Sequence, residues 1–389
     1  MLIDIIAGAR PNFMKIAPII KEMHRINDEA KNNNKSDKFL EYRLIHTGQH
    51  YDKNMSGAFF EQLGIPEPHI NLESGSGSQS EQTGKIMVRY EEVLKERLSD
   101  LCIVVGDVTS TMACSITAKK MGVRVAHVEG GIRSRDMTMP EEINRLATDS
   151  ITDYFFTTSD IANTNLRREG VDDDRIFFVG NTMIDTLLGN LNKLQKPVIY
   201  DSENLEAGNY FVMTLHRPAN VDEQNKLKEL IDNIAKGVRK EKIVFPVHPR
   251  TKNILNDMGI SHNNIIYTDP LGYLEFIYLV KHARAVITDS GGITEETTVL
   301  GIPCLTLRDN TERPETVTEG TNELIGTDPS AVKPVLNRLM DGGWKSGQIP
   351  AKWDGKASEK IVENILKLWN QGRLERQKPF VDHDLIVRE

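Results

Sequence analysis

The sequence is poor in cysteine and has no long apolar segment. Its three cysteines, Cys102, Cys114 and Cys304, lie in or beside apolar stretches, and no two of them have the Cys-x-x-Cys spacing. We therefore expect buried thiols in a reducing compartment. No run approaches the roughly 18 uncharged apolar residues that a membrane-spanning helix needs, and the apolar N-terminus is too short for a signal peptide. These observations predict a cytoplasmic protein with no membrane partner.

Clustered positive charge is also missing. The chain of 389 residues has a formal net charge of -8, and it has no lysine and arginine run of the kind that binds phosphate backbones. We therefore expect no nucleic-acid partner. An anionic ligand would have to meet local rather than global positive charge.

Two familiar signatures of cofactor sites are missing as well. No His-Glu-x-x-His motif is present, so the sequence gives no basis for a metal site. The segment GSGS at residues 75–78 resembles the start of a dinucleotide-binding fingerprint, but it follows no clear strand and lacks the third glycine. We expect neither a metal nor a redox cofactor.

What is present is an alternation of short β-rich runs with longer amphipathic ones, which is typical of parallel sheets with crossover helices. Strands are expected near residues 2–8, 41–47, 100–106, 123–129, 153–158 and 175–179, and again near 209–215, 242–248, 264–268, 284–288, 303–307 and 323–326. The pattern predicts an α/β protein with two Rossmann-like parallel-sheet domains, at residues 1–190 and 205–357, facing a central cleft. A terminal helix at residues 358–376 is expected to return to the first domain.

Several polar residues of the first half directly follow expected strands. Ligands bind at the carboxyl ends of strands in open parallel sheets, so these positions are candidates for a site. Arg10 and Lys15 follow the first strand, with a solvated loop as the alternative. Asp107 follows the third strand, where it is either a site residue or a helix cap. Glu129 ends the fourth, and Glu141 lies shortly downstream. Carboxylates brought together raise one another's pKa, which suits general acid/base catalysis.

The second half supplies complementary charge. His216 and His248 end successive strands at equivalent positions. We expect His216 to give a proton or hydrogen bond to a leaving phosphate, while Arg217 or Arg250 neutralises it. For His248 a structural hydrogen bond is an equal alternative. Arg313, after the strand near 303–307, is a further candidate cation.

Arg145 is a candidate in the first half, close to the carboxylates. An i, i+4 ion pair with Glu141 inside one helix is the alternative explanation for both residues.

The most specific motif is TDSGGITEE at residues 288–296. A strand breaks into Ser290, Gly291 and Gly292 and a helix begins at once, so free backbone N–H groups and the helix dipole face one point. Glycine lets a diphosphate approach that backbone, and Glu296 is placed to accept hydrogen bonds from ribose hydroxyls. A role as first-turn dipole partners would explain the acids but not the paired glycines.

Together these segments resemble the UDP-N-acetylglucosamine 2-epimerase family. The resemblance follows the family's order from residue 2 to about residue 370. The matching motifs are GARP (8–11) with Lys15, TGQH (47–50), GD (106–107), HVEGGIR (127–133), PEEINR (140–145), GNTMID (180–185), TLHR (214–217), TDSGG (288–292) with Glu295 and Glu296, and RDNTERPE (308–315).

The resemblance implies the two-Rossmann architecture called GT-B and a reversible inversion at C2, which gives UDP-N-acetylmannosamine. The family eliminates UDP to a 2-acetamidoglucal and then adds UDP back. By position, the resemblance makes Asp107, Glu129 and Glu141 the acid/base residues and His216 the group that assists UDP departure. The substrate-binding residues would be Arg10, Lys15, Arg145 and Arg313 near the diphosphate, Ser290, Gly291 and Gly292 on it, Glu296 at the ribose, Phe276 at the uracil, and His248. The partner would be a UDP-sugar, and we expect a homodimer.

Two segments depart from the family's pattern. Members that use the substrate as an allosteric activator carry Gln-His-Arg-Glu after the second strand, where this chain has QHYDKNM at residues 49–55, and residues 71–77 differ as well. This looks more like the branch that acts on UDP-2,3-diacetamido-2,3-dideoxy-glucuronic acid, so the C3 substituent and allosteric activation stay open. A hydrolysing epimerase, a GT-B glycosyltransferase and a non-catalytic sensor are competing interpretations. The glycosyltransferase and the sensor would not need three carboxylates opposite the sugar.

Overall fold

The computed structural model describes residues 1–32, 39–48, 63–247 and 249–377. The chain divides into two compact units. One consists of Met1–Leu188 with Ala351–Glu389, and the other is Gly189–Pro350.

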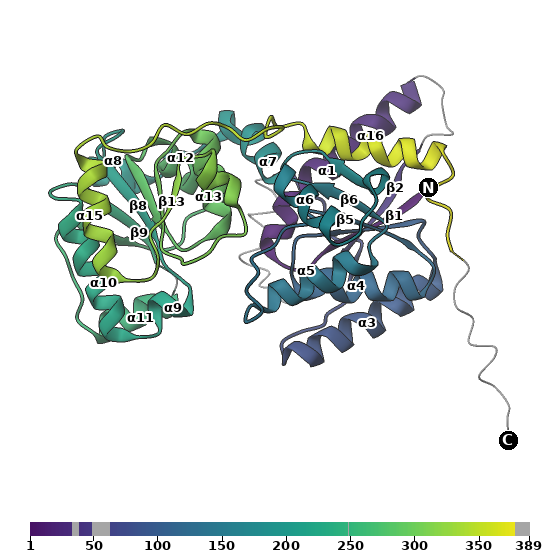
Figure 1. The fold of residues 1–389 in the computed structure, drawn as a ribbon, viewed down its shortest axis with the longest axis horizontal. Coiled ribbons are helices and arrows are strands. Elements are labelled where there is room, and N and C mark those ends of the chain that lie inside the picture. Colours follow the sequence, from purple (N-terminus) through teal and green to yellow (C-terminus); the bar gives the residue numbers. More distant parts are fainter. Residues whose placement is uncertain (33–38, 49–62, 248, 378–389) are drawn as a thin grey trace. The chain divides into compact units, whose positions relative to one another are not determined.

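The first unit is built on a seven-stranded sheet with the order β3-β2-β1-β4-β5-β6-β7, and every paired neighbour is parallel (Figure 1). The chain runs outward from β1 to β3 and then returns to β4 on the other side of β1. The strand order therefore reverses between β1 and β4. The strands are β1 (Leu2–Ala7), β2 (Glu41–His46), β3 (Ile70–Asn71), β4 (Leu101–Val105), β5 (Arg124–Val128), β6 (Tyr154–Thr157) and β7 (Ile176–Phe178).

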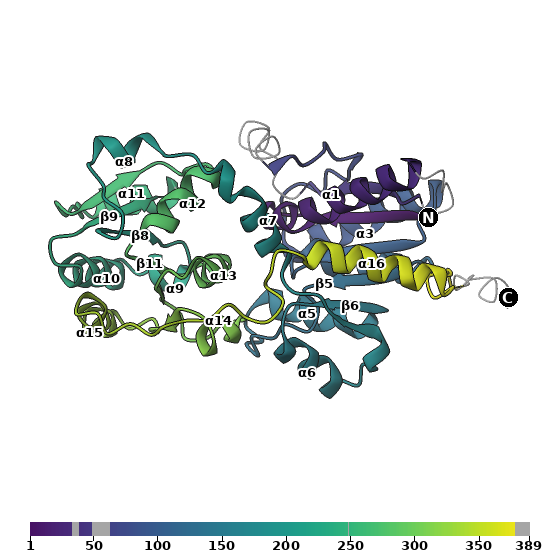
Figure 2. The ribbon, with the colours of Figure 1, turned by 90° about the horizontal axis from the view of Figure 1, so that it is seen from above.

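Helices cover both faces of this sheet, which is why all six residues of β1 are buried. α1 and α16 lie side by side on one face, and α3 packs against α4 on the other (Figures 1 and 2). The helices are α1 (Arg10–Asn32), α3 (Gln79–Glu96), α4 (Thr109–Lys120), α5 (Pro140–Ile151), α6 (Asp160–Arg168), α7 (Thr182–Asn190) and α16 (Ala357–Asn370).

The serine and glycine segment at residues 75–78 has a structural role at the start of α3. The Ser78 side chain accepts a hydrogen bond from the Glu81 N–H, and the Glu81 carboxylate accepts one from the Ser78 N–H. This capping box satisfies backbone donors that a helix start leaves without partners. The helix then buries Ile86, Tyr90 and Val93 at helical spacing.

The second unit has a six-stranded parallel sheet with the order β10-β9-β8-β11-β12-β13, which reverses between β8 and β11. Its strands are β8 (Tyr210–Thr214), β9 (Lys242–Pro246), β10 (Ile265–Thr268), β11 (Ala285–Thr288), β12 (Cys304–Thr306) and β13 (Asn322–Leu324). Its helices are α8 (Val198–Ser202), α9 (Pro218–Val221), α10 (Gln224–Gly237), α11 (Pro249–Asp257), α12 (Tyr273–His282), α13 (Gly291–Leu300), α14 (Pro314–Thr318) and α15 (Pro329–Met340). α10 and α15 pack on one face of the sheet, and α12 packs on the other.

The expected strands are confirmed to within two residues at each end. The short strand β3 was not expected, because two residues are too few to show a pattern. The two-Rossmann α/β class is confirmed by the two parallel sheets.

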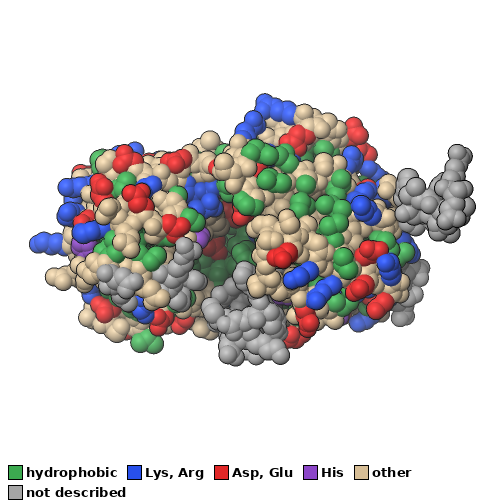
Figure 3. All heavy atoms as spheres, turned by 90° about the horizontal axis from the view of Figure 1, so that it is seen from below, with side chains coloured by type: hydrophobic (Ala, Val, Ile, Leu, Met, Phe, Trp, Pro, Cys, Tyr) green, Lys and Arg blue, Asp and Glu red, His purple; other side chains and the backbone are tan. Residues whose placement is uncertain are grey.

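The three cysteines are buried and free, as expected. Burial raises the pKa of the Cys304 thiol to about 11, so it stays neutral at physiological pH. No helix in the described ranges is long and apolar enough to cross a membrane. On the face drawn in Figure 3, acidic and basic side chains are interspersed and form no single basic area.

Candidate active site

In the first unit, the site lies where β4 and β5 end. The two strands pair in register from Leu101 with Arg124 to Val105 with Val128, so the residues that follow them emerge at the same edge. Gly106 turns the chain with a φ of +68°, a conformation that favours glycine. The strand order reverses next to β4, and this is where open parallel sheets bind ligands.

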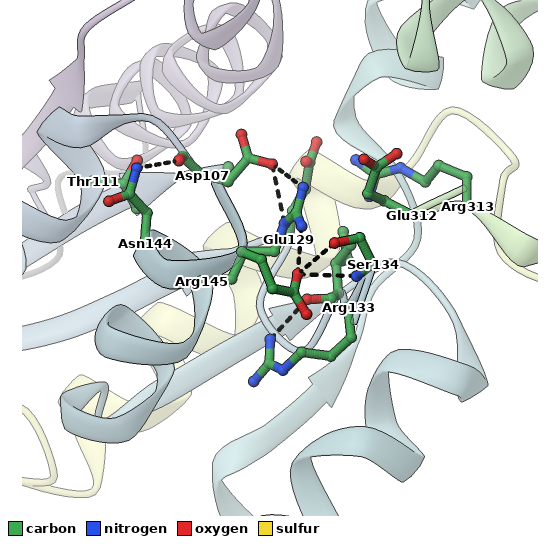
Figure 4. A network of polar contacts seen from close by, with 12 residues as sticks. Asp107, Thr111, Glu129, Arg133, Ser134, Asn144, Arg145, Glu312 and Arg313 are labelled. Atoms are coloured by element: carbon green, nitrogen blue, oxygen red, sulfur yellow. Dashed lines mark hydrogen bonds and ion pairs between the residues drawn. The ribbon is translucent and has the colours of Figure 1, made fainter. Parts of the chain in front are cut away.

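Asp107 is held by an arginine from α5. The Nε and Nη2 of Arg145 lie 3.0 and 2.6 Å from Asp107 Oδ2, and the Asn144 side chain donates to the Asp107 carbonyl at 2.9 Å (Figure 4). The Arg145 side chain is only 4% exposed, whereas that of Asp107 is 33% exposed. The arginine thus fixes the orientation of a carboxyl group that solvent or a ligand can reach.

Glu129 is the second carboxylate, and it is buried. Its backbone has a φ of +72°, which costs a residue with a side chain about 1–3 kcal/mol. Its N–H donates to the Phe156 carbonyl at 2.9 Å, which holds this turn to β6. Lys15 Nζ lies 2.7 Å from Glu129 Oε2. Lys15, expected near a diphosphate, thus pairs with a carboxylate of its own unit.

Glu141 does not form the i, i+4 ion pair with Arg145 that was the alternative explanation. Within the described residues Glu141 is half-buried, and its side chain makes no hydrogen bond or ion pair. Its neighbour Glu142 is buried instead, and its Oε2 lies 2.6 Å from Arg145 Nη1. The reason is that Glu142 also accepts the backbone N–H groups of Ser134 and Arg135, at 2.9 and 2.8 Å.

The sequence reasoning missed Glu142. Its i, i+3 spacing to Arg145 places both residues on the same side of the helix and could have indicated this ion pair. Burial alone would raise the pKa of Glu142, but hydrogen bonds from Ser134, Arg135 and Arg145 outweigh it and lower that pKa below its usual value. Glu142 is therefore a fixed anion that anchors Arg145.

Four of the candidate features lie wholly or partly outside the described residues. Arg10 begins α1, but its side chain lies outside the described residues, as does that of Arg250. His248 and the segment 49–55 also lie outside them.

In the second unit, His216 follows β8 and meets Asp289, which follows β11. His216 Nδ1 lies 2.8 Å from Asp289 Oδ1; the histidine side chain is 54% exposed and the aspartate is fully buried. Asp289 Oδ2 also accepts the backbone N–H groups of His216 and Arg217, at 3.0 and 2.9 Å, and the Asn220 side chain at 3.2 Å.

Asp289 lies in the TDSGG motif (288–292), but the sequence alone assigned it no role. Burial acts to raise its pKa, yet the hydrogen bonds from His216 and from the backbone outweigh burial and lower it. A fixed aspartate on Nδ1 orients the ring and leaves Nε2 as the nitrogen that can act on a ligand.

The Ser290 to Gly292 segment leaves a helix start open. α13 begins at Gly291, and no side-chain hydrogen bond caps it at Ser290. A Cβ added at Gly291 would meet nothing closer than Arg308 Nη1 at 3.6 Å, and one at Gly292 would meet nothing within 4 Å. Neither glycine has a positive φ. Neither packing nor backbone conformation therefore requires glycine at these two positions. Without side chains, however, the N–H groups at the start of α13 stay exposed, and such groups suit an anion.

Two acids of α13 face different partners. Glu295 pairs with Arg313 Nε, so Arg313 is held within the second unit. Glu296 is buried and accepts a hydrogen bond from Tyr273 Oη at 2.9 Å. Burial raises the pKa of Glu296 to about 8, so its carboxyl is largely neutral at pH 7. Phe276, on α12 with Tyr273, is half-buried and packs against the core of this unit.

Among the residues that the structure describes, no group of three or more His, Cys, Asp or Glu side chains is arranged to hold a metal ion.

Comparisons with known proteins agree on one family. The model of the family described as UDP-N-acetylglucosamine 2-epimerase matches residues 32–366. The UDP-N-acetylglucosamine 2-epimerase of Methanocaldococcus jannaschii is 41% identical over 381 residues, which cover 93% of this chain and 98% of that protein. The UDP-2,3-diacetamido-2,3-dideoxy-D-glucuronate 2-epimerase of Pseudomonas aeruginosa is 35% identical, with 95% of this chain and 100% of that one covered.

A solved structure supports the same fold. The crystal structure of the Methanocaldococcus jannaschii UDP-GlcNAc 2-epimerase in complex with UDP-GlcNAc and UDP matches with a TM-score of 0.81 and 40% identity, over 94% of this chain and 100% of that chain. This match confirms the two-domain architecture expected from the sequence.

Proposed function

The chain belongs to the UDP-N-acetylglucosamine 2-epimerase family, and on that basis we propose that it interconverts UDP-N-acetylglucosamine and UDP-N-acetylmannosamine. The observation that carries the proposal is the pair of carboxylates, Asp107 and Glu129, at the ends of neighbouring strands, each fixed by a cation. Paired acid/base groups are what removal and return of a carbon-bound proton require.

In the proposed reaction, a carboxylate of the first unit takes the C2 proton and the bond between C1 and the UDP oxygen breaks. The C–H electrons form the double bond of a 2-acetamidoglucal, and the electrons of the broken bond leave with UDP. A proton then returns to the opposite face of C2, and UDP adds back to C1. Asp107, Glu129 and Glu141 are the proposed acid/base residues. We propose that His216 donates through Nε2 to the departing diphosphate, as its pairing with Asp289 supports.

The UDP moiety is assigned to the second unit. The open start of α13 at Gly291 would receive the diphosphate, and Glu296 would receive the ribose hydroxyls. Phe276 would contact uracil, and Arg10, Lys15, Arg145, His248 and Arg313 complete the proposed binding set.

UDP-N-acetylglucosamine is the favoured substrate over the diacetamido glucuronate. The more similar of the two relatives is named for UDP-N-acetylglucosamine, at 41% against 35% identity. We also propose that the protein is a homodimer, which sedimentation of the purified chain would test.

The proposal is tested by proton NMR of the protein with UDP-N-acetylglucosamine in deuterated water. We expect UDP-N-acetylmannosamine to appear, deuterium to replace hydrogen at C2, and trace UDP to accumulate. Free N-acetylmannosamine with stoichiometric UDP would show a hydrolysing enzyme instead. Turnover of only the 3-acetamido uronic analogue would reassign the substrate, and no reaction with either sugar would contradict the proposal.

A further inference from the structure

His127, in β5, is fully buried and makes two short polar contacts. Its Nδ1 lies 2.6 Å from Asp149 Oδ1, and its Nε2 lies 2.8 Å from the Gly106 carbonyl oxygen. A carbonyl oxygen can only accept a hydrogen bond, so Nε2 carries a proton. The ring thus donates to the residue that directly precedes Asp107.

Asp149, from α5, is the other partner. Its Oδ2 accepts the Gly131 N–H at 2.9 Å and lies 2.7 Å from Arg133 Nη1. Burial acts to raise the pKa of Asp149, but the contacts from His127, Arg133 and Gly131 outweigh it and lower that pKa. An ionised carboxylate can only accept, so the Nδ1 of His127 donates as well. Protons on both nitrogens, as in an imidazolium, would satisfy both contacts.

The pair lies directly against the turn that carries Glu129. A Cβ added at Gly130 would come within 3.3 Å of His127 Nδ1 and 3.4 Å of Asp149 Oδ1. Gly131 has a φ of +82°, and a Cβ there would come within 2.6 Å of the Ala162 carbonyl. Gly130 therefore lets the turn rest on the His127–Asp149 pair, and Gly131 lets the turn approach α6.

We propose that the buried His127–Asp149 pair positions both catalytic carboxylates, because His127 holds the Gly106 carbonyl next to Asp107 and Asp149 holds the Gly131 N–H two residues after Glu129. This inference rests on the proposed function. His127 is a positioning residue, since both of its ring nitrogens are bonded to the protein. The ring adds a side-chain contact between the two turns, whose backbones also meet where the Gly106 N–H donates to the Val128 carbonyl at 3.1 Å.

Two substitutions test separately the His127 contact with Asp149, called the Asp149 link, and its contact with the Gly106 carbonyl, called the Gly106 link. In His127→Asn the amide nitrogen stands near the place of Nδ1, so the Asp149 link is kept and the Gly106 link is lost. In His127→Gln it stands near the place of Nε2, so the Gly106 link is kept. Misplacement of a catalytic group by about 1 Å can cost on the order of 100-fold in rate. We expect kcat to fall by about that factor in His127→Asn and by less in His127→Gln. KM and UDP affinity should change less than kcat, because the proposed contacts to ribose and at the helix start at Gly291 lie in the second unit.

His262→Asn is the matched control. His262 Nε2 lies 2.8 Å from Asp232 Oδ1 in the second unit, so this substitution also removes a histidine–aspartate pair, but one away from the proposed site. We expect its kcat to equal that of the unmutated enzyme. A purely structural role for His127 would lower the melting temperature and leave kcat intact well below it.

The charge of the His127 ring can be measured directly in the unmutated protein. With 15N-labelled histidine, we expect two ring N–H signals for His127, identified by their loss in the variants. A single ring N–H would overturn the imidazolium, and a folded His127→Asn enzyme with unchanged kcat would overturn the positioning role. If the unmutated protein does not epimerise UDP-N-acetylglucosamine, the proposed function fails, while the NMR result still decides the charge of the pair.

Discussion

Arg145 donates two hydrogen bonds to a single oxygen of Asp107, at 3.0 and 2.6 Å from Oδ2, and leaves Oδ1 without a partner among the described residues. The same guanidinium reaches Glu142 on its other side. One buried cation therefore fixes the orientation of Asp107, a proposed acid/base residue, and is itself fixed by the Glu142 carboxylate.

This geometry predicts that Arg145→Lys impairs catalysis although it keeps the charge. An ammonium cannot supply the planar set of donors that serves Asp107 and Glu142 together. We expect kcat to fall by about 10- to 100-fold, through misplacement of Asp107. Initial rates measured by chromatography of the sugar nucleotides would show this fall in kcat. Arg239→Lys, at an exposed ion pair with Asp341, is the control, and equal rates in the two variants would contradict the prediction.

Asp107→Asn and Glu129→Gln should each remove an acid/base group while keeping its size. The expected loss in kcat is about 10²–10⁴-fold, the range for general acid or base groups. UDP affinity, measured by calorimetry, should stay within about twofold, because a charge lost at the sugar changes ground-state UDP contacts little. If either variant turned over at the normal rate, the residue replaced in it would not be an acid/base group.

Glu141 and Glu142 are adjacent but should respond differently. Glu142→Gln removes the buried anion that holds Arg145, so it should lower both the melting temperature and kcat. Glu141→Gln should leave the melting temperature unchanged, because the Glu141 side chain makes no ion pair within the described residues, and should lower kcat, because Glu141 is a proposed acid/base residue. Thermal unfolding and rates of both variants decide whether Glu141 belongs to the acid/base set.

Gly291→Val should weaken UDP binding in a folded protein. The added Cβ has room within the protein, but the side chain would cover N–H groups at the start of α13. Loss of hydrogen bonds to a charged group, about 1.5–3 kcal/mol, corresponds to roughly 10- to 100-fold in affinity. Gly189→Ala, where a Cβ meets nothing within 4 Å, is the control. Calorimetry showing native UDP affinity in Gly291→Val would place the diphosphate elsewhere.

UDP affinity should rise with pH toward about 8. Glu296 in the free protein has a pKa of about 8, and it must lose its proton to accept hydrogen bonds from both ribose hydroxyls. Binding should therefore release a proton below that pH, so affinity increases with pH up to about 8 and then levels off. Calorimetry in buffers of different ionisation enthalpy measures this proton release. Glu296→Gln should weaken binding and abolish the release, and a release that persists in that variant would assign it to another group.

The strands, the two-sheet class and most of the residues at the strand ends could be predicted from the sequence. Apolar runs of four to six residues with polar residues just after them are a local property, and parallel strands place their carboxyl ends at one edge. The positions of Asp107, Glu129, His216 and Ser290 could therefore be predicted. The open helix start at Gly291 is likewise a feature of consecutive residues.

The partners of these residues were decided only by the tertiary structure. Arg145 is 38 positions from Asp107, Asp149 is 22 from His127, and the Asp289 carboxylate meets backbone N–H groups 72 and 73 positions away. Such contacts depend on the strand order and on the rotation of each helix about its axis, and no local pattern encodes either. The same rotation turns Glu142 rather than Glu141 toward Arg145, because only one of two adjacent helical residues can face the core.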